Sequence, residues 1–199
     1  VVLITSAGST VGIICGYCGG VVDNILMRIA DIFLAFPGIV FAIAVASVLS
    51  GGITSAVIAV AAVSWPKYAR LARSEVLSVC ASDYIKAARM SGMSEFGIII
   101  KHIIPNIAGI IVTTALLDIG HMMMEIAGLS FLGLGAAPPA AEWGAMMSNG
   151  RSMLQTAPWI ILAPGVAIFV SVLIFNMFGE SVKTRWNKNN RRTGYAGRQ

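Results

Sequence analysis

The stretch Asp83-Tyr-Ile-Lys-Ala-Ala-Arg-Met-Ser-Gly92, continued by Met-Ser-Glu-Phe-Gly-Ile-Ile-Ile-Lys-His-Ile-Ile-Pro105, decides how this chain is organised. It is polar, basic and patterned for helices, yet it lies between two strongly apolar segments. Ser82 is a good helix N-cap, and Gly92 can end a first helix because glycine adopts the left-handed conformation at low cost. Ser94 can cap a second helix. The sequence therefore predicts two short helices around a glycine turn, in an ordered loop suited to docking on another protein.

The composition is that of a membrane protein. Of the 199 residues, 57% are hydrophobic and 12% are charged, and the mean hydropathy is +0.82. Soluble domains carry about 25% charged residues, so most of this chain must face lipid or other membrane helices. The net charge of +5 does not indicate a nucleic-acid partner, because all but Arg151 of the 14 Lys and Arg residues can be placed on one side of a membrane. The positive-inside rule makes that side cytoplasmic.

The apolar segments predict an all-α, polytopic transmembrane helical bundle, since a membrane helix needs about 20 apolar residues. Residues 1–182 form the predicted transmembrane domain, and residues 183–199 form a basic cytoplasmic tail. Because Val1 already lies inside an apolar segment, we also predict that the chain is truncated and that at least one further span precedes it. The five predicted spans are residues 1–20, 25–49, 56–66 (with an end near residues 70–73), 106–127 and 158–178.

Small residues repeat along the first apolar segment. Gly8, Gly12 and Gly16 are spaced by four and therefore lie on one face of a helix. Such a face permits close approach of two helices in lipid. The spacing leaves two hypotheses open: packing within this chain, or an interface with a partner subunit.

The loop at residues 82–105 resembles the coupling loop in membrane subunits of binding-protein-dependent ABC importers. The residues that carry the resemblance are Ala87, Ala88, Gly92, Ile104 and Pro105. In that family the loop docks on a separate ATPase, so the resemblance implies a role in ATPase coupling for these five residues. The alternative is an ordinary amphipathic loop at the membrane interface.

The chain has no nucleotide site of its own that the sequence can identify. No Gly-x-x-x-x-Gly-Lys-Ser/Thr motif, which would cradle phosphates, occurs in it. The resemblance therefore implies a transport subunit that is not an enzyme and binds no cofactor, with ATP and Mg²⁺ used by a partner ATPase.

Further motifs extend the resemblance to nearly the whole chain except the tail, and they are similar to those of the peptide/nickel permease family. This resemblance implies a multi-pass protein of the bacterial cytoplasmic (inner) membrane. It also implies three kinds of protein partner in addition to lipid: a homologous second permease subunit, two ABC ATPase subunits and an extracytoplasmic substrate-binding protein. The motifs are Gly16-Tyr-Cys-Gly-Gly20, Asp23, Met27-Arg28, Asp31, Ala35-Phe-Pro37, Trp65-Pro-Lys-Tyr-Ala-Arg70, Leu129-Ser-Phe-Leu-Gly-Leu-Gly135, Pro138-Pro139 and Trp143-Gly144.

Three ionisable residues in the fourth predicted span form a candidate translocation path. Asp118, His121 and Glu125 are spaced i, i+3 and i+7, which places them on one face over about 10 Å of helix. Ionisable groups inside a span are costly and usually face a bundle interior or a pathway. The run Asp118-Ile-Gly-His-Met-Met123 resembles nickel-type members of the family, and His121 and Asp118 are plausible contacts for a divalent metal.

We therefore predict a permease for nickel, another metal ion or a metal chelate. Three alternatives remain at this point. His121 and Asp118 can simply hydrogen-bond each other and fix helix packing, with no contact to a metal. The chain can instead be a dipeptide or oligopeptide permease. It can also be a secondary transporter that uses the Asp-His-Glu stripe, although such a transporter would not need the coupling loop.

Overall fold

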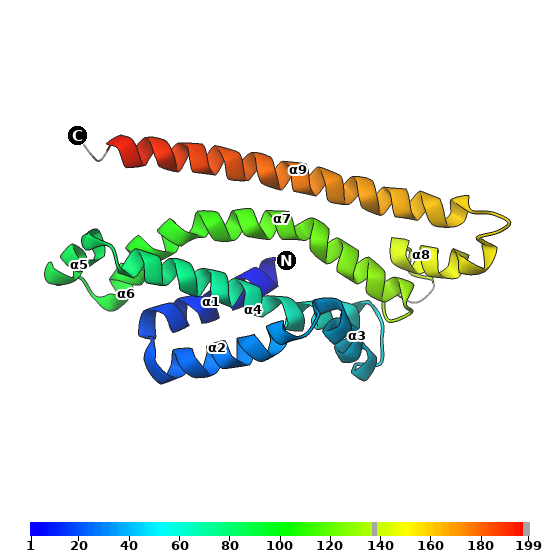
Figure 1. Ribbon diagram of the computed structural model, residues 1–199, viewed down its shortest axis with the longest axis horizontal. Coiled ribbons are helices and arrows are strands. Elements are labelled where there is room, and N and C mark those ends of the chain that lie inside the picture. The colour runs from blue at the N-terminus through cyan, green and yellow to red at the C-terminus, as the bar shows by residue number, and fades with distance from the viewer. Residues whose placement is uncertain (137–138, 197–199) are drawn as a thin grey trace. The chain divides into compact units, whose positions relative to one another are not determined.

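The chain is helical throughout the part that the structure describes. A computed structural model gives the backbone of residues 1–136 and 139–196, with side chains in the same ranges as far as Trp186. Every regular element in these ranges is a helix (Figure 1), which confirms the all-α prediction. Pro138 of the Pro138-Pro139 motif and the last three residues of the predicted tail lie outside the described residues. The elements are α1 (Val2–Cys18), α2 (Gly20–Ala35), α3 (Gly38–Val48), α4 (Ile53–Cys80), α5 (Asp83–Met90), α6 (Glu95–Ile98), a π-helical turn (Ile99–Ile103), α7 (Ile104–Phe131), α8 (Trp143–Gly150), a 3₁₀ turn (Arg151–Met153) and α9 (Trp159–Ala196).

Fewer helices qualify as membrane spans than the sequence predicted. Within the described ranges, two unbroken helices are long and apolar enough: Glu95–Phe131, which joins α6, the π turn and α7, and Trp159–Trp186 of α9. The pair α2 and α3, broken at Phe36 and Pro37, adds a third candidate if it forms one span. Length and composition therefore support two or three of the five predicted spans.

The two remaining predicted spans fall short for different reasons. Helix α1 is apolar but has only 17 residues, whereas a straight span needs about 20. Helix α4 has 28 residues, but its second half carries Lys67, Arg70, Arg73 and Glu75. The backbone of α9 continues as a helix through most of the predicted tail, as far as Ala196.

The described chain divides into two compact units. Unit 2 contains α1 and the loop at residues 82–105, and unit 1 contains α3 and α8. The long helices contribute segments to both. Unit 1 comprises Val1, Leu34–Ser64 and Leu116–Phe178, and unit 2 comprises Val2–Phe33, Trp65–Ala115 and Gly179–Gln199.

The glycine face of α1 packs on α4 inside unit 2. A Cβ atom on Gly8 would lie 2.6 Å from the carbonyl oxygen of Trp65, and one on Gly16 would lie 2.9 Å from Cβ of Val76. Such distances are too short for real side chains, so the two backbones approach each other closely. Of the two hypotheses for this face, the structure therefore supports packing within the chain.

A small aliphatic core lies beneath the predicted coupling loop, also in unit 2. It draws side chains from α4, α5, α6, the π turn and α7, so it fastens the loop to the two long helices that flank it. Tyr17 and Ile13 of α1 pack against its edge. The core residues are Ala72, Val76, Ile85, Ile98, Ile103, Ile107 and Ile111.

In unit 1, the Gly- and Pro-rich segment after α7 leads into α8. The carboxylate of Glu142 caps α8 by accepting hydrogen bonds from the backbone N–H groups of Gly144 (3.0 Å) and Ala145 (2.8 Å). Gly144 lies so close to Ala127 that a Cβ would be 2.9 Å from the carbonyl carbon of that residue. The motif residue Gly144 therefore has a structural role, which is to let α8 lie against α7.

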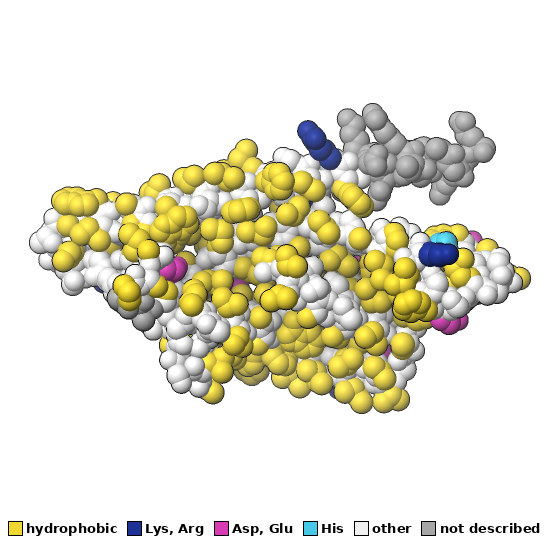
Figure 2. Space-filling model, turned by 180° about the vertical axis from the view of Figure 1, so that it is seen from behind, with side chains coloured by type: hydrophobic (Ala, Val, Ile, Leu, Met, Phe, Trp, Pro, Cys, Tyr) yellow, Lys and Arg dark blue, Asp and Glu magenta, His cyan; other side chains and the backbone are white. Residues whose placement is uncertain are grey.

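Apolar side chains remain exposed over much of the surface, as expected for the membrane protein that the composition predicts. Figure 2 shows hydrophobic side chains over most of the visible face, with few charged groups among them. Helix α9 contributes many of them, and its apolar side chains are mostly exposed. Examples are Trp159, Leu162, Val166, Phe169, Leu173 and Met177.

Candidate functional site

The segment at residues 82–105 folds as the sequence predicted, with two short helices separated by a glycine turn (Figure 1). Helix α5 ends at Met90, and Gly92 has a φ of +78°, in the left-handed region that glycine adopts at low cost. Helix α6 begins at Glu95. We call this segment, from Ser82 to Ile98, the coupling hairpin.

The two predicted helix caps differ from each other. Ser94 caps α6 as expected, because its hydroxyl accepts a hydrogen bond from the backbone N–H of Gly97 at 3.2 Å. Ser82 occupies the N-cap position of α5, but its hydroxyl instead donates to the carbonyl of Val79 at 2.5 Å. The start of α5 is therefore stabilised by the negative charge of Asp83 in its first turn.

The hairpin continues into α7 without a break in the helix. We expected Pro105 to mark an end or a bend, but the chain passes from α6 through a π-helical turn, Ile99–Ile103, directly into α7. Pro105 is the second residue of α7, where the wider turn before it accommodates the missing N–H. Single π turns inside α-helices are frequent at functional sites.

The predicted coupling residues are mostly exposed. Ala87, Gly92, Ile104 and Pro105 are exposed and Ala88 is half-buried. A partner can therefore reach this surface over small side chains.

Two larger apolar side chains on the hairpin were not predicted as part of the site. Met90 at the end of α5 is 90% exposed, and Phe96 in α6 is 74% exposed. By contrast, Ile85 and Ile98 on the same two helices are fully buried in the core of unit 2. Nothing in the sequence distinguishes the apolar residues of this segment that are buried from those that stay exposed.

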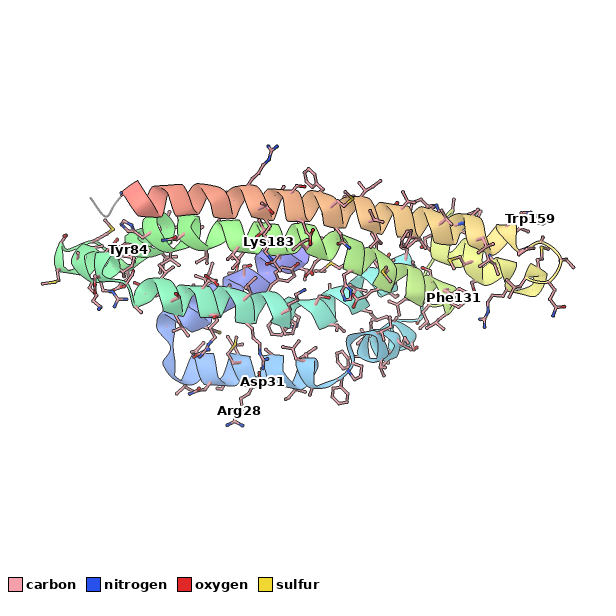
Figure 3. All side chains as sticks on the ribbon, turned by 45° about the horizontal axis from the view of Figure 1, so that its top comes forward. Arg28, Asp31, Tyr84, Phe131, Trp159 and Lys183 are labelled. Carbon is pink, nitrogen blue, oxygen red and sulfur yellow. The ribbon has the colours of Figure 1, made fainter. Side chains whose placement is uncertain are left out.

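Polar contacts also hold the hairpin in place. The hydroxyl of Tyr17, in α1, donates a hydrogen bond to the carboxylate of Glu95, which also lies 3.6 Å from the guanidinium of Arg89. On α5, Tyr84 (labelled in Figure 3) accepts a hydrogen bond from the side-chain amide of Asn106 at 2.5 Å. The hairpin is thus tied to α1 through one tyrosine and to α7 through another.

Two ion pairs connect α2 to α4, and the sequence analysis did not predict either. The guanidinium of Arg73 forms a two-pronged contact with the carboxylate of Asp23, at 2.5 and 2.6 Å. Arg70 pairs with Asp31. Together with Met27, three of these residues line a polar cleft of about 370 Å³: Asp31, Arg70 and Arg73.

These ion pairs were not predicted, because the positive-inside rule uses every basic residue only as a marker of the cytoplasmic face. The two arginines three residues apart, and the two aspartates eight apart, share helix faces, but sequence alone cannot match one face to the other. Arg28 shows the contrast, since it projects outward from α2 (Figure 3).

The predicted polar stripe on α7 lies in unit 1, and two of its members, His121 and Glu125, form a close pair. The Nε2 atom of His121 lies 3.3 Å from Oε1 of Glu125, whereas the side chain of Asp118 is buried. His121 is 68% exposed at its side chain and Glu125 is 15% exposed. No group of three or more His, Cys, Asp or Glu residues that could hold a metal ion occurs among the described residues.

Glu125 also faces the break between α2 and α3. A Cβ atom on Gly38 would lie 3.8 Å from Oε1 of Glu125, so the carboxylate is close to the first residue of α3. Helix N-termini favour nearby negative charge. Binding sites in transporters are often built at such broken helices, so this part of the stripe is the better candidate for a path residue.

Comparison with known proteins identifies the family of the chain. Residues 8–188 match the family model of the binding-protein-dependent transport system inner membrane component. The chain therefore belongs to the family of inner-membrane permease components of binding-protein-dependent transporters.

Individual relatives carry three different cargo names. The chain is 44% identical over 176 residues to the dipeptide transport system permease protein DppC of Alkalihalophilus pseudofirmus. It is 43% identical over 176 residues to the glutathione transport system permease protein GsiD of Pectobacterium atrosepticum. It is 38% identical over 181 residues to the nickel transport system permease protein NikC of Escherichia coli. These alignments cover 88–91% of this chain but only 58–65% of each relative.

Proposed function

We propose that this chain is a membrane-spanning permease subunit of an ATP-driven importer, and that its coupling hairpin docks on a separate ABC ATPase. One observation carries the proposal: the hairpin is buried on one side through Ile85 and Ile98, yet it exposes Met90 and Phe96. Two large apolar side chains left exposed on so polar a segment support an interface with another protein. The small side chains of Ala87 and Ala88 allow the ATPase surface to approach α5 closely.

The family of the chain supports the rest of the assembly. A binding-protein-dependent transporter needs an extracytoplasmic binding protein to deliver cargo and an ATPase to supply energy. We propose a homologous second permease subunit and two ATPase subunits as its partners in the inner membrane. The sequence has no P-loop of its own, so ATP and Mg²⁺ belong to the ATPase subunits.

The test is transport by the reconstituted importer in liposomes. We expect uptake of cargo only when the binding protein, both permease subunits, the ATPase subunits and ATP are all present. Uptake that continues without the ATPase subunits, driven by an ion gradient, would favour the secondary-transporter alternative and would contradict the proposal.

The charge pattern supports an orientation with the hairpin and the C-terminal end of α9 on the cytoplasmic side. The segment around α8 would then face outward. In a background where Cys15, Cys18 and Cys80 are replaced, Asn149→Cys should react with an impermeant thiol reagent applied from outside. Lys183→Cys should not react. The opposite labelling pattern would invert the orientation.

Short peptides are the first candidate cargo. The two relatives at 43–44% identity are named for dipeptide and glutathione transport, and both of these cargoes are small peptides. Nickel or another metal is the second candidate, because His121 and Glu125 lie 3.3 Å apart on α7. A relative at 38% identity is named for nickel transport, but a pair of ligands fits brief contact with a passing metal or chelate better than a resident ion.

Substitution of His121 separates the two cargoes. If His121 contacts a metal in transit, His121→Ala and His121→Asn should each lower uptake of ⁶³Ni²⁺ more than about tenfold at unchanged protein level, because asparagine is a poor metal ligand. If the residue only pairs with Glu125, asparagine still supplies a donor. In that case His121→Ala, which has no donor, loses one intramembrane hydrogen bond at a cost of only about 0.6 kcal/mol. Full ⁶³Ni²⁺ uptake by His121→Asn, measured beside uptake of a labelled dipeptide, would exclude the ligand role.

A further inference from the structure

Three side chains from separate helices meet at the second helix of the coupling hairpin. The hydroxyl of Tyr17, at the end of α1, donates to the carboxylate of Glu95 in the first turn of α6. The same carboxylate lies 3.6 Å from the guanidinium of Arg89 in α5, and that guanidinium lies 5.6 Å from the centre of the Tyr17 ring. We call this cluster the Tyr17 clamp.

The position of the clamp matters because the hairpin is joined to the flanking helices through points where the backbone departs from α-helix. These are the turn at Ala81 and Ser82 after α4 and the π-helical turn at Ile99–Ile103 before α7, and the Gly92 turn adds a third such point inside the hairpin. Each can absorb a change in direction. A push on the hairpin can therefore be lost as local bending unless another contact fixes the hairpin to the helices beneath it.

Helix α1 is a firm base for such a contact. Its glycine face packs closely on α4, and Tyr17 lies one residue before the end of α1. Tyr17 and Glu95 are 78 residues apart in sequence, so the chain itself provides no short connection between them. Asn106 and Tyr84 also fasten the hairpin, but they connect it to α7, which the backbone already joins to α6.

We propose that Tyr17 is a positioning residue for energy coupling: its bond to Glu95 fixes the hairpin against α1, so that movement imposed by the ATPase reaches α1. This inference rests on the docking role proposed above for the hairpin. Glu95 and Arg89 connect both hairpin helices to the same tyrosine, so the two helices move together.

The Tyr17 clamp should matter for energy coupling but contribute little to the stability of the fold. The side chains of Arg89 and Glu95 are 48% and 65% exposed, and exposed ion pairs contribute little to stability. The fold of the hairpin instead depends on buried isoleucines, among them Ile85 and Ile98. Removal of the clamp should therefore leave the subunit folded while it weakens the transfer of movement.

The experiment compares Tyr17→Phe, which removes only the hydroxyl, with the unsubstituted importer in liposomes. The readout is cargo transported per ATP hydrolysed, together with the stimulation of ATP hydrolysis by loaded binding protein. We expect the transport ratio to fall about two- to fivefold, the scale of one exposed charge-assisted contact, with unchanged membrane level and unchanged ATPase co-purification. Glu95→Gln should have a smaller effect, because its carbonyl oxygen still accepts from Tyr17.

Asn106→Ala is the matched control, since it removes the hydrogen bond that ties the hairpin to α7 at Tyr84 but leaves α1 attached. It should keep the transport ratio close to that of the unsubstituted importer. An unchanged ratio in Tyr17→Phe, or equal losses in both variants, would overturn the inference. Failure of the docking proposal itself has a different signature, because the ATPase would then not co-purify with the unsubstituted subunit either.

Discussion

Gly12→Ala should destabilise the subunit strongly, although alanine is the better helix former. A Cβ atom on Gly12 would overlap the carbonyl oxygen of Ala69 and lie 2.8 Å from Cβ of Ala72. Both contacts lie on α4, and the nearest atom belongs to the backbone, which cannot rotate away. Overpacking of this kind typically costs about 1–3 kcal/mol, whereas helix propensity alone would stabilise by about 1 kcal/mol. Overpacking lowers the stability of the subunit and helix propensity raises it, so the sign of the measured change in stability shows which effect is larger.

The measurement is the thermal midpoint of the purified subunit in detergent, together with its level in the membrane. Both should fall in Gly12→Ala. Ala7→Val is a suitable control, because it adds bulk to an exposed position of the same helix. It should leave the midpoint nearly unchanged. A higher midpoint in Gly12→Ala would mean that α1 does not pack on α4 in the membrane as it does in this structure.

The hairpin could be predicted from sequence because its signals are local. Gly92 and Ser94 each act on their own turn, and both took the conformations expected of them. Ser82 occupies its expected position, but its hydroxyl bonds to the preceding turn, because a serine has more than one carbonyl or N–H within reach. Local signals therefore fixed the element boundaries better than they fixed individual bonds.

Features that depend on pairing between distant segments could not be predicted. The ion pairs of Asp23 with Arg73 and Asp31 with Arg70 need the relative register of α2 and α4, which no single segment encodes. These arginines also explain why α4 did not match the predicted third span. A charged face on α4 was interpreted as a loop boundary, whereas the helix continues to Cys80 with its arginines paired.

The polar stripe falls between these two cases. Helical periodicity predicted that Asp118, His121 and Glu125 share a face, and the pairing of His121 with Glu125 agrees with that spacing. The periodicity could not say that Asp118 is buried or that the carboxylate of Glu125 lies close to Gly38. Both facts depend on how unit 1 folds, and the second makes Glu125 more interesting as a path residue than its sequence neighbourhood indicated.

Gly92→Val should abolish most transport while the subunit still inserts in the membrane. The φ of Gly92 is +78°, and a Cβ atom built there would meet nothing within 4 Å. The expected defect is therefore conformational and not steric. A left-handed conformation costs an L-residue roughly 1–2 kcal/mol, and a β-branched side chain is especially unfavourable there. The chain can avoid this strain by changing the turn, which would reorient α5 relative to α6.

Reorientation of these helices would change the positions of Met90 and Phe96, and with them the surface that we propose docks on the ATPase. We therefore expect uptake and the cargo-stimulated rate of ATP hydrolysis to fall together by about tenfold or more, which corresponds to about 1.4 kcal/mol of lost docking energy. Gly92→Asn provides the matched control, because asparagine tolerates the left-handed region. It should keep most of both activities. Normal stimulation of the ATPase by Gly92→Val would contradict the docking role of the hairpin, and equal losses in both variants would show that the turn conformation is not the cause.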